Sequence, residues 1–128
     1  MTNKVEIAQD HLLSKSCIKF TFHGKFTTEV CHQAVVDFNK KFQNSPAPFN
    51  FLWDCTPMAG FDLAARKEWI TFLQSLEGKL GKVNVISDNI VTRGSARLLL
   101  KLFGLEGEVY KNYEEILQDK KGVNLNAA

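Results

Sequence analysis

The sequence predicts an α/β fold, a mixed sheet with a parallel central portion and helices packed against it. Short apolar runs alternate along the chain with longer segments whose apolar residues recur every three or four positions. These are the patterns of strands and amphipathic helices, and strands joined by crossover helices lie parallel. The chain has 128 residues, of which 45% are hydrophobic and ten are Phe, enough for one core. We therefore expect residues 1–128 to form a single domain with a frayed tail from about residue 122.

The first third of the chain predicts two strands and a helix. Val5–Ala8 form the first, short strand, and Cys17–His23 form a clearer one in which apolar and polar residues alternate. Gly24 is expected to end this second strand. Thr27 or Thr28 then caps a helix. Its apolar residues recur at helical spacing: Val30, Ala34, Phe38 and Phe42.

The middle of the chain predicts a buried strand, a helix and a second buried strand. Asn44–Pro48 contain two prolines and break the first helix, and the apolar run Phe49–Cys55 is typical of a central strand. The second helix begins near Phe61 or Asp62. Lys82–Ser87 form the next strand. The stripe of the second helix that faces the sheet is expected to comprise Ala65, Trp69, Phe72, Leu76 and Leu80.

The last third of the chain completes the order β-β-α-β-α-β-α-β-α. Ile90–Phe103 form the third helix, which Gly104 ends. Glu108–Tyr110 form a short strand and Asn112–Lys120 a last helix. Ligands of such sheets tend to bind beyond the carboxyl ends of the strands, so the loops that follow the third and fourth strands are the places to search for a site.

The segment from Asp54 to Ala65 carries a resemblance to a known family. Asp54 and Asp62 have the spacing of two aspartates in the bacterial anti-sigma-factor antagonists, in which the second opens an Asp-Ser-Ser-Gly turn with a regulatory phosphoserine. The chain resembles these STAS domains. It is more closely similar to their SpoIIAA-like branch, a relative of the SEC14-type lipid-binding modules, in Gly60-Phe61, Trp69 and Ser87-Asp88-Asn89 followed by Arg93-Gly94. The resemblance implies a regulatory module that works through protein contacts.

The same segment departs from the antagonists at the residue that carries their switch. Leu63-Ala64-Ala65 replaces Ser-Ser-Gly, and Ala64 stands at the phosphoserine position. Alanine has no hydroxyl to accept a phosphoryl group. We therefore expect no regulatory phosphorylation between Asp62 and Lys67.

The loop from Asp54 to Asp62 is the first candidate binding site. It offers the side chains of Asp54, Thr56 and Met58 beside the start of a helix. Asp62 alone is explained most simply as the cap of that helix, where its carboxylate also suits the helix dipole. A metal site at Asp54 would need further acidic residues at neighbouring strand ends, and the early strands supply none, so no metal is expected.

The loop from Ser87 onward is the second candidate, and it favours an anion. Its ligand-binding candidates are Ser87, Asn89, Thr92, Arg93 and Arg97, in which hydroxyl, amide and cationic groups converge at a helix start. Asp88 or Asn89 also has the simpler reading of a helix cap. Three cations follow one another at spacing four and so share one side of the helix: Arg93, Arg97 and Lys101. They form either a solvated face or a docking surface for phosphate, a lipid headgroup or an acidic partner.

The third helix has more apolar residues than one narrow stripe requires. Leu98 and Leu102 are therefore candidate interface residues in a homodimer, and burial by other parts of the chain is the alternative. The apolar residues of this helix and its end are Ala96, Leu98, Leu99, Leu100, Leu102, Phe103 and Leu105.

Composition and motifs exclude several functions. The net charge of +2 is too small to indicate nucleic-acid binding, and no apolar run approaches the length of a transmembrane segment. The three cysteines do not cluster, which favours a reducing compartment and hence the cytoplasm. No nucleotide-binding loop, catalytic triad or metal-ligand spacing occurs, so we expect no enzyme and no cofactor. The sequence favours a non-catalytic interaction module, with a carrier or sensor of an anionic or lipid-like ligand at Ser87–Arg97 as the alternative.

Overall fold

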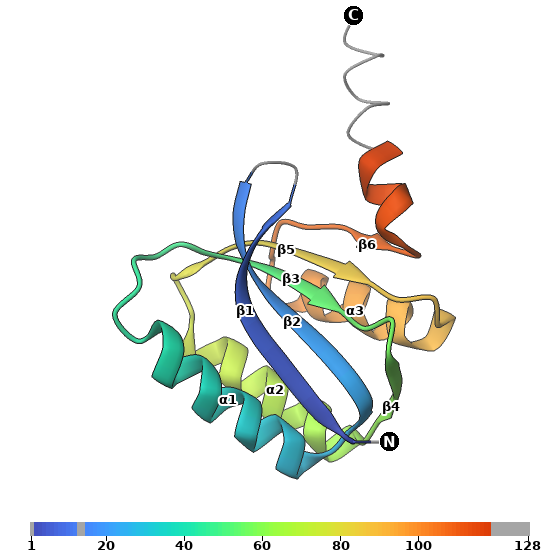
Figure 1. The fold of residues 1–128 in the computed structure, drawn as a ribbon, viewed down its shortest axis with the longest axis horizontal. Coiled ribbons are helices and arrows are strands. Elements are labelled where there is room, and N and C mark those ends of the chain that lie inside the picture. The colour runs from blue at the N-terminus through green and yellow to red at the C-terminus, as the bar shows by residue number, and fades with distance from the viewer. Residues whose placement is uncertain (1, 13–14, 119–128) are drawn as a thin grey trace, which may run out of the picture.

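The computed structural model describes residues 2–12 and 15–118, which form a six-stranded sheet with helices packed on it (Figure 1). The strands lie in the order β1-β2-β3-β5-β6, and β4 pairs with the end of β2. β1 and β2 are antiparallel, whereas every other pair is parallel. The predicted α/β fold with a parallel central portion is thus confirmed. The strands are β1 Lys4–Leu12, β2 Lys15–Phe26, β3 Phe49–Asp54, β4 Met58–Phe61, β5 Leu80–Ile86 and β6 Val109–Tyr110.

Three helices contribute to one hydrophobic cluster on one face of the sheet. They are α1 (Thr28–Phe42), α2 (Leu63–Ser75) and α3 (Ile90–Leu102). α1 and α2 run side by side, and α3 lies against β5 and β6 (Figure 1). A further helical segment, residues 113–118, contributes to a smaller cluster with side chains of the sheet. That cluster consists of Cys17, Leu52, Ile86, Tyr110 and Ile116.

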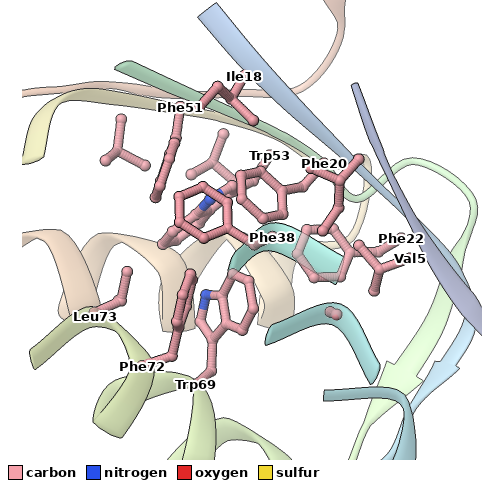
Figure 2. Packing of buried hydrophobic residues seen from close by; sticks show 14 of the residues in the cluster. Val5, Ile18, Phe20, Phe22, Phe38, Phe51, Trp53, Trp69, Phe72 and Leu73 are labelled. Atoms are coloured by element: carbon pink, nitrogen blue, oxygen red, sulfur yellow. The ribbon is translucent and has the colours of Figure 1, made fainter. Parts of the chain in front are cut away.

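Aromatic side chains dominate the larger cluster (Figure 2). The alternation predicted for the second strand is confirmed, because Ile18, Phe20 and Phe22 all enter this core. Trp69 of α2 packs against them from the opposite layer, with its ring 5.7 Å from that of Phe20. Alternating residues of β2 and recurring residues of α2 therefore meet in one layer, as their two periodicities require.

The strands differ from the sequence prediction in four places. Gly24 does not end β2, which continues to Phe26. With φ of 69°, Gly24 instead lies where the pairing with β4 shifts register. β4 itself falls within the segment expected to be a loop. Leu80, expected on the stripe of α2, opens β5, because the helix ends at Ser75. β1 extends beyond Val5–Ala8 on both sides because it pairs with β2 from Lys15 to His23.

The helix ends agree with the sequence prediction in three cases and differ in one. Thr27 caps α1 by accepting a hydrogen bond from the Val30 amide, and Asn89 caps α3. Gly104, with φ of 61°, follows the end of α3. Asp62 precedes α2 but accepts no capping hydrogen bond, because its carboxylate pairs with Lys25 at 3.1 Å. The predicted last helix is described as far as residue 118; its remaining residues and the tail from 122 lie outside the described part.

Candidate functional site

The structure distributes the predicted site residues over three separate surfaces. Asp54, Thr56 and Arg93 line a polar depression at the carboxyl edge of the sheet. Met58 and Thr92 line a small apolar pocket between α2, α3 and β4. Leu98 and Leu102 lie exposed on α3, as does Arg97. The expected convergence of these residues on one site is therefore only partial.

The polar depression is formed where β3, β5 and β6 end. Its volume is about 600 Å³, which falls within the usual range of ligand sites, ~300–1,000 Å³. Sequence reasoning missed the part contributed after β6, although the carboxyl-end rule used for the other strands applies there too. The residues that line the polar depression are Asp54, Thr56, Asp88, Arg93, Lys111, Asn112 and Tyr113.

Asp54 is held in place by its neighbours. One of its carboxylate oxygens accepts the Thr56 amide at 3.0 Å, and the other accepts the Tyr113 hydroxyl at 3.3 Å. Lys19 Nζ lies 3.9 Å from the second oxygen and 5.3 Å from the centre of the Tyr113 ring. Burial raises the pKa of Tyr113, and the hydrogen bond with Tyr113 raises the pKa of Lys19. Lys19, Asp54 and Tyr113 thus form one connected group that ties the segment after β6 to the sheet.

Arg93 and Arg97 do not share a site. Arg93 is only 9% exposed, and its guanidinium donates to the Ser87 carbonyl at 2.9 Å. Arg97 is exposed and does not line the polar depression. The amides at the start of α3 are also engaged, because Asn89 Oδ1 accepts from Val91 and Thr92. Of the two arginines that were predicted to bind an anion together, only Arg93 therefore lies at the polar depression.

The apolar pocket is too small to enclose a lipid-like ligand. Its volume is about 60 Å³, well below the range that ligand sites usually occupy, ~300–1,000 Å³. Trp53 Nε1 and Arg66 Nε, both from residues that line it, have no hydrogen-bond partner among the described residues. Because the volume of this pocket is small, the core beneath α3 has little free space. The lining residues are Phe22, Phe26, Trp53, Cys55, Met58, Phe61, Arg66, Trp69, Val85, Thr92, Ser95, Ala96 and Leu99.

α3 has a second apolar face in addition to the one that it buries. Ala96, Leu99 and Leu100 pack into the core. Four large hydrophobic side chains lie on the opposite side, which we call the outer face of α3, and each is more than half exposed. These residues are Ile90, Val91, Leu98 and Leu102.

The cysteines are placed as core residues. Cys17, Cys31 and Cys55 are buried and free, and burial raises the pKa of all three thiols, that of Cys31 to about 11. A raised pKa lowers the fraction of reactive thiolate at neutral pH. Among the residues that the structure describes, no group of three or more His, Cys, Asp or Glu could hold a metal ion.

Thiol titration tests this placement. We expect the native protein to react slowly with Ellman's reagent at pH 8, and the guanidinium-unfolded protein to react rapidly at all three cysteines. Rapid labelling of one native thiol would instead identify an accessible nucleophile.

Comparison with solved structures identifies the class of fold. No protein-family model matches the sequence, and no curated protein matches it. The structure is similar to an uncharacterised protein of the DUF3478 family with a SpoIIAA-like fold from Shewanella loihica PV-4. Their TM-score is 0.75 at 16% identity, over 92% of this chain and 94% of that one.

A second solved structure supports the same class. The anti-sigma factor antagonist SpoIIAA in its unphosphorylated form matches with a TM-score of 0.53 at 10% identity, over 90% of this chain and 96% of that one. At these identities the likeness shows the fold alone. The protein therefore has a SpoIIAA-like fold of the STAS type, as the resemblance in sequence implied. No helix within the described residues is long and apolar enough to cross a bilayer.

Proposed function

We propose that the protein is a non-catalytic interaction module of the STAS-like type, and that it acts through protein contacts made by the outer face of α3. The observation that carries this proposal is the exposure of Ile90, Val91, Leu98 and Leu102 above a core that is already filled. Clustered apolar side chains on a protein surface typically mark a binding interface. We propose a cytoplasmic location for this module, which the three buried free thiols support because they suit a reducing compartment.

A second copy of the chain fits this surface. Ile90, Gly94, Leu98 and Leu102 follow at spacing four and form one stripe along the exposed side of α3. Two such helices crossing antiparallel at a two-fold axis near Leu98 would place Leu102 of each copy over Gly94 of the other. A Cβ built on Gly94 has no neighbour within 4 Å. The stripe therefore leaves space at Gly94 for the Leu102 side chain of the other copy.

The charges beside the stripe suit the rim of such an interface. Arg97 and Lys101 are exposed four residues apart along one flank of the stripe, where rim side chains stay solvated. A contact made by one helix face is small, and small interfaces are weak. We therefore expect the dimer to dissociate in the micromolar range.

The switch of the antagonists has no counterpart at the corresponding position. Ala64 lies exposed in the first turn of α2 and carries no hydroxyl. We therefore expect that the proposed module is not switched by phosphorylation at this position. A carrier of lipid-like molecules is the less favoured alternative because the apolar pocket is small.

Sedimentation velocity tests the proposed interface. We expect the wild-type protein to shift from monomer to dimer as its concentration rises from low to several hundred micromolar. Leu98→Glu should remain monomeric throughout, because a buried unpaired carboxylate opposes association. Val36→Glu is the matched control, since Val36 of α1 is 57% exposed and Leu98 is 55% exposed.

Two results would contradict the proposal. One is a wild-type monomer at every concentration, and the other is equal loss of the dimer in Leu98→Glu and Val36→Glu. The second result would place the contact elsewhere.

A further inference from the structure

We propose that the polar depression binds a phosphate monoester, with Arg93 and Lys111 as the cations that hold its phosphate. This inference is independent of the interface on α3, because neither Arg93 nor Lys111 belongs to the outer face. The polar depression lies at the carboxyl ends of parallel strands, where α/β sheets commonly bind ligands.

The first argument is the state of Arg93. Its side chain is nine-tenths buried, and arginine keeps its charge at physiological pH. No carboxylate of the described residues lies within 4.0 Å of the guanidinium. One N–H group donates to the Ser87 carbonyl, and the others have no partner among the described residues. Buried charges in proteins are normally paired, so an anion is the missing partner.

The second argument is the balance of charges around the polar depression. Lys111 also lines it and forms no ion pair with the described residues. The Asp54 carboxylate already interacts with Lys19, the Thr56 amide and the Tyr113 hydroxyl. Asp88 is exposed at the edge and is the only lining carboxylate without a partner among the described residues. The unpaired groups therefore consist of two cations and one carboxylate.

The third argument concerns the chemistry of the ligand. A guanidinium matches the oxygens of a phosphate with two parallel hydrogen bonds, and a lysine ammonium adds a second charge. Thr56 and Asn112 offer a hydroxyl and an amide beside these cations. The volume of about 600 Å³ exceeds what a single ion occupies, so the phosphate belongs to a larger polar molecule.

Calorimetry at low ionic strength tests the proposal, with inorganic phosphate and glycerol 3-phosphate as probes and acetate as the carboxylate control. We expect glycerol 3-phosphate to bind more tightly than phosphate, and phosphate more tightly than acetate. Arg93→Gln should weaken binding of both phosphate probes at least about tenfold, because it removes the charge and the guanidinium donors but keeps a polar side chain. Lys111→Gln should weaken binding by a smaller factor.

Arg97→Gln is the matched control, because it removes the same charge one helical turn away on an exposed position. It should leave both dissociation constants unchanged. Equal losses in Arg97→Gln and Arg93→Gln, or no binding of either phosphate probe to the wild type at millimolar concentrations, would overturn the proposal.

Thermal melts separate a binding role of Arg93 from a purely structural one. Without ligand, Arg93→Gln should melt close to the wild-type temperature, since removal of an unpaired buried charge offsets loss of the hydrogen bond to the Ser87 carbonyl. Phosphate should raise the melting temperature of the wild type but not that of the variant, because only a native state that binds gains stability. A variant that melts lower than the wild type but responds equally to phosphate would contradict the proposal.

Amide chemical shifts of the wild-type protein provide a test that needs no variant. On titration with glycerol 3-phosphate, we expect the largest changes at Thr56, Asp88 and residues 111–113. Changes centred on Arg97 and Lys101 would place the anion on the solvent-exposed side of α3 instead of in the polar depression, and would overturn the proposal.

Discussion

Replacing Trp69 by alanine is expected to lower the free energy of unfolding by about 3–5 kcal/mol, as other large-to-small core substitutions do. Trp69 is 4% exposed and lies where the aromatic residues of β2, β3 and α2 meet (Figure 2). The substitution removes the contacts of its ring with five others and leaves a cavity between α2 and the sheet. Those rings, with centroids 4.9–5.7 Å away, are Phe20, Phe22, Phe26, Trp53 and Phe72.

Urea denaturation at constant m-value measures this loss. Trp69→Phe is the control, because it keeps an aromatic ring in the same place and should cost clearly less than the alanine variant. A loss below about 1 kcal/mol for Trp69→Ala would mean that the side chain contributes little to the core, contrary to its position in the structure.

Gly107→Ala is expected to be the other strongly destabilising substitution, with a cost of about 3–5 kcal/mol. Gly107 has φ of 151°, a conformation that residues with a side chain rarely adopt, and a Cβ there would overlap the Val83 backbone of β5. This close approach belongs to the pairing of the segment before β6 with β5, where the Val83 amide donates to the Glu106 carbonyl at 2.8 Å. Both the strain and the overlap would have to be relieved by moving that segment.

Gly60 offers a matched comparison for this substitution. Its φ of 152° is nearly identical to that of Gly107, but a Cβ at Gly60 meets no atom within 4 Å. Gly60→Ala should therefore show the conformational cost alone, about 1–3 kcal/mol. Equal losses of stability for the two alanine variants in urea melts would mean that residue 107 does not pack against β5 as described.

Local patterns in the sequence were sufficient to predict most of the fold. The alternation in β2 and the helical spacing in α1 and α3 each depend on residues that are close in the chain, and each prediction is confirmed. β4 could not be predicted in this way, because it pairs with Gly24–Phe26 at the end of β2, which is distant in the chain. The role of Gly107 is likewise set by β5, a distant part of the chain.

The candidate site was only partly predictable for a similar reason. Arg93 and Arg97 look equivalent at spacing four, but residues four apart on a helix differ by about 40° in direction. That rotation is enough to bury Arg93 beside Ser87 and to leave Arg97 in solvent. The contribution of Lys111 and Tyr113 depends on which strand β6 pairs with, and periodicity does not specify this.

The proposed phosphate site and the proposed dimer interface lie on different sides of α3. Arg93 points from this helix toward the carboxyl end of β5, whereas Leu98 and Leu102 point away from the core. A ligand held by Arg93 would therefore contact the same helix that forms the proposed dimer. In the proposed module, one helix would thus contact both the ligand and the partner.

Disulfide crosslinking of Leu98→Cys tests the proposed use of the outer face of α3 most directly. In the proposed dimer the two copies of residue 98 would lie near the two-fold axis, close enough for a disulfide, whereas the native thiols are buried. Under mild oxidation we predict a covalent dimer for Leu98→Cys and none for the equally exposed Val36→Cys. Absence of the Leu98→Cys dimer, or its formation at the same rate as a Val36→Cys dimer, would contradict association through this face.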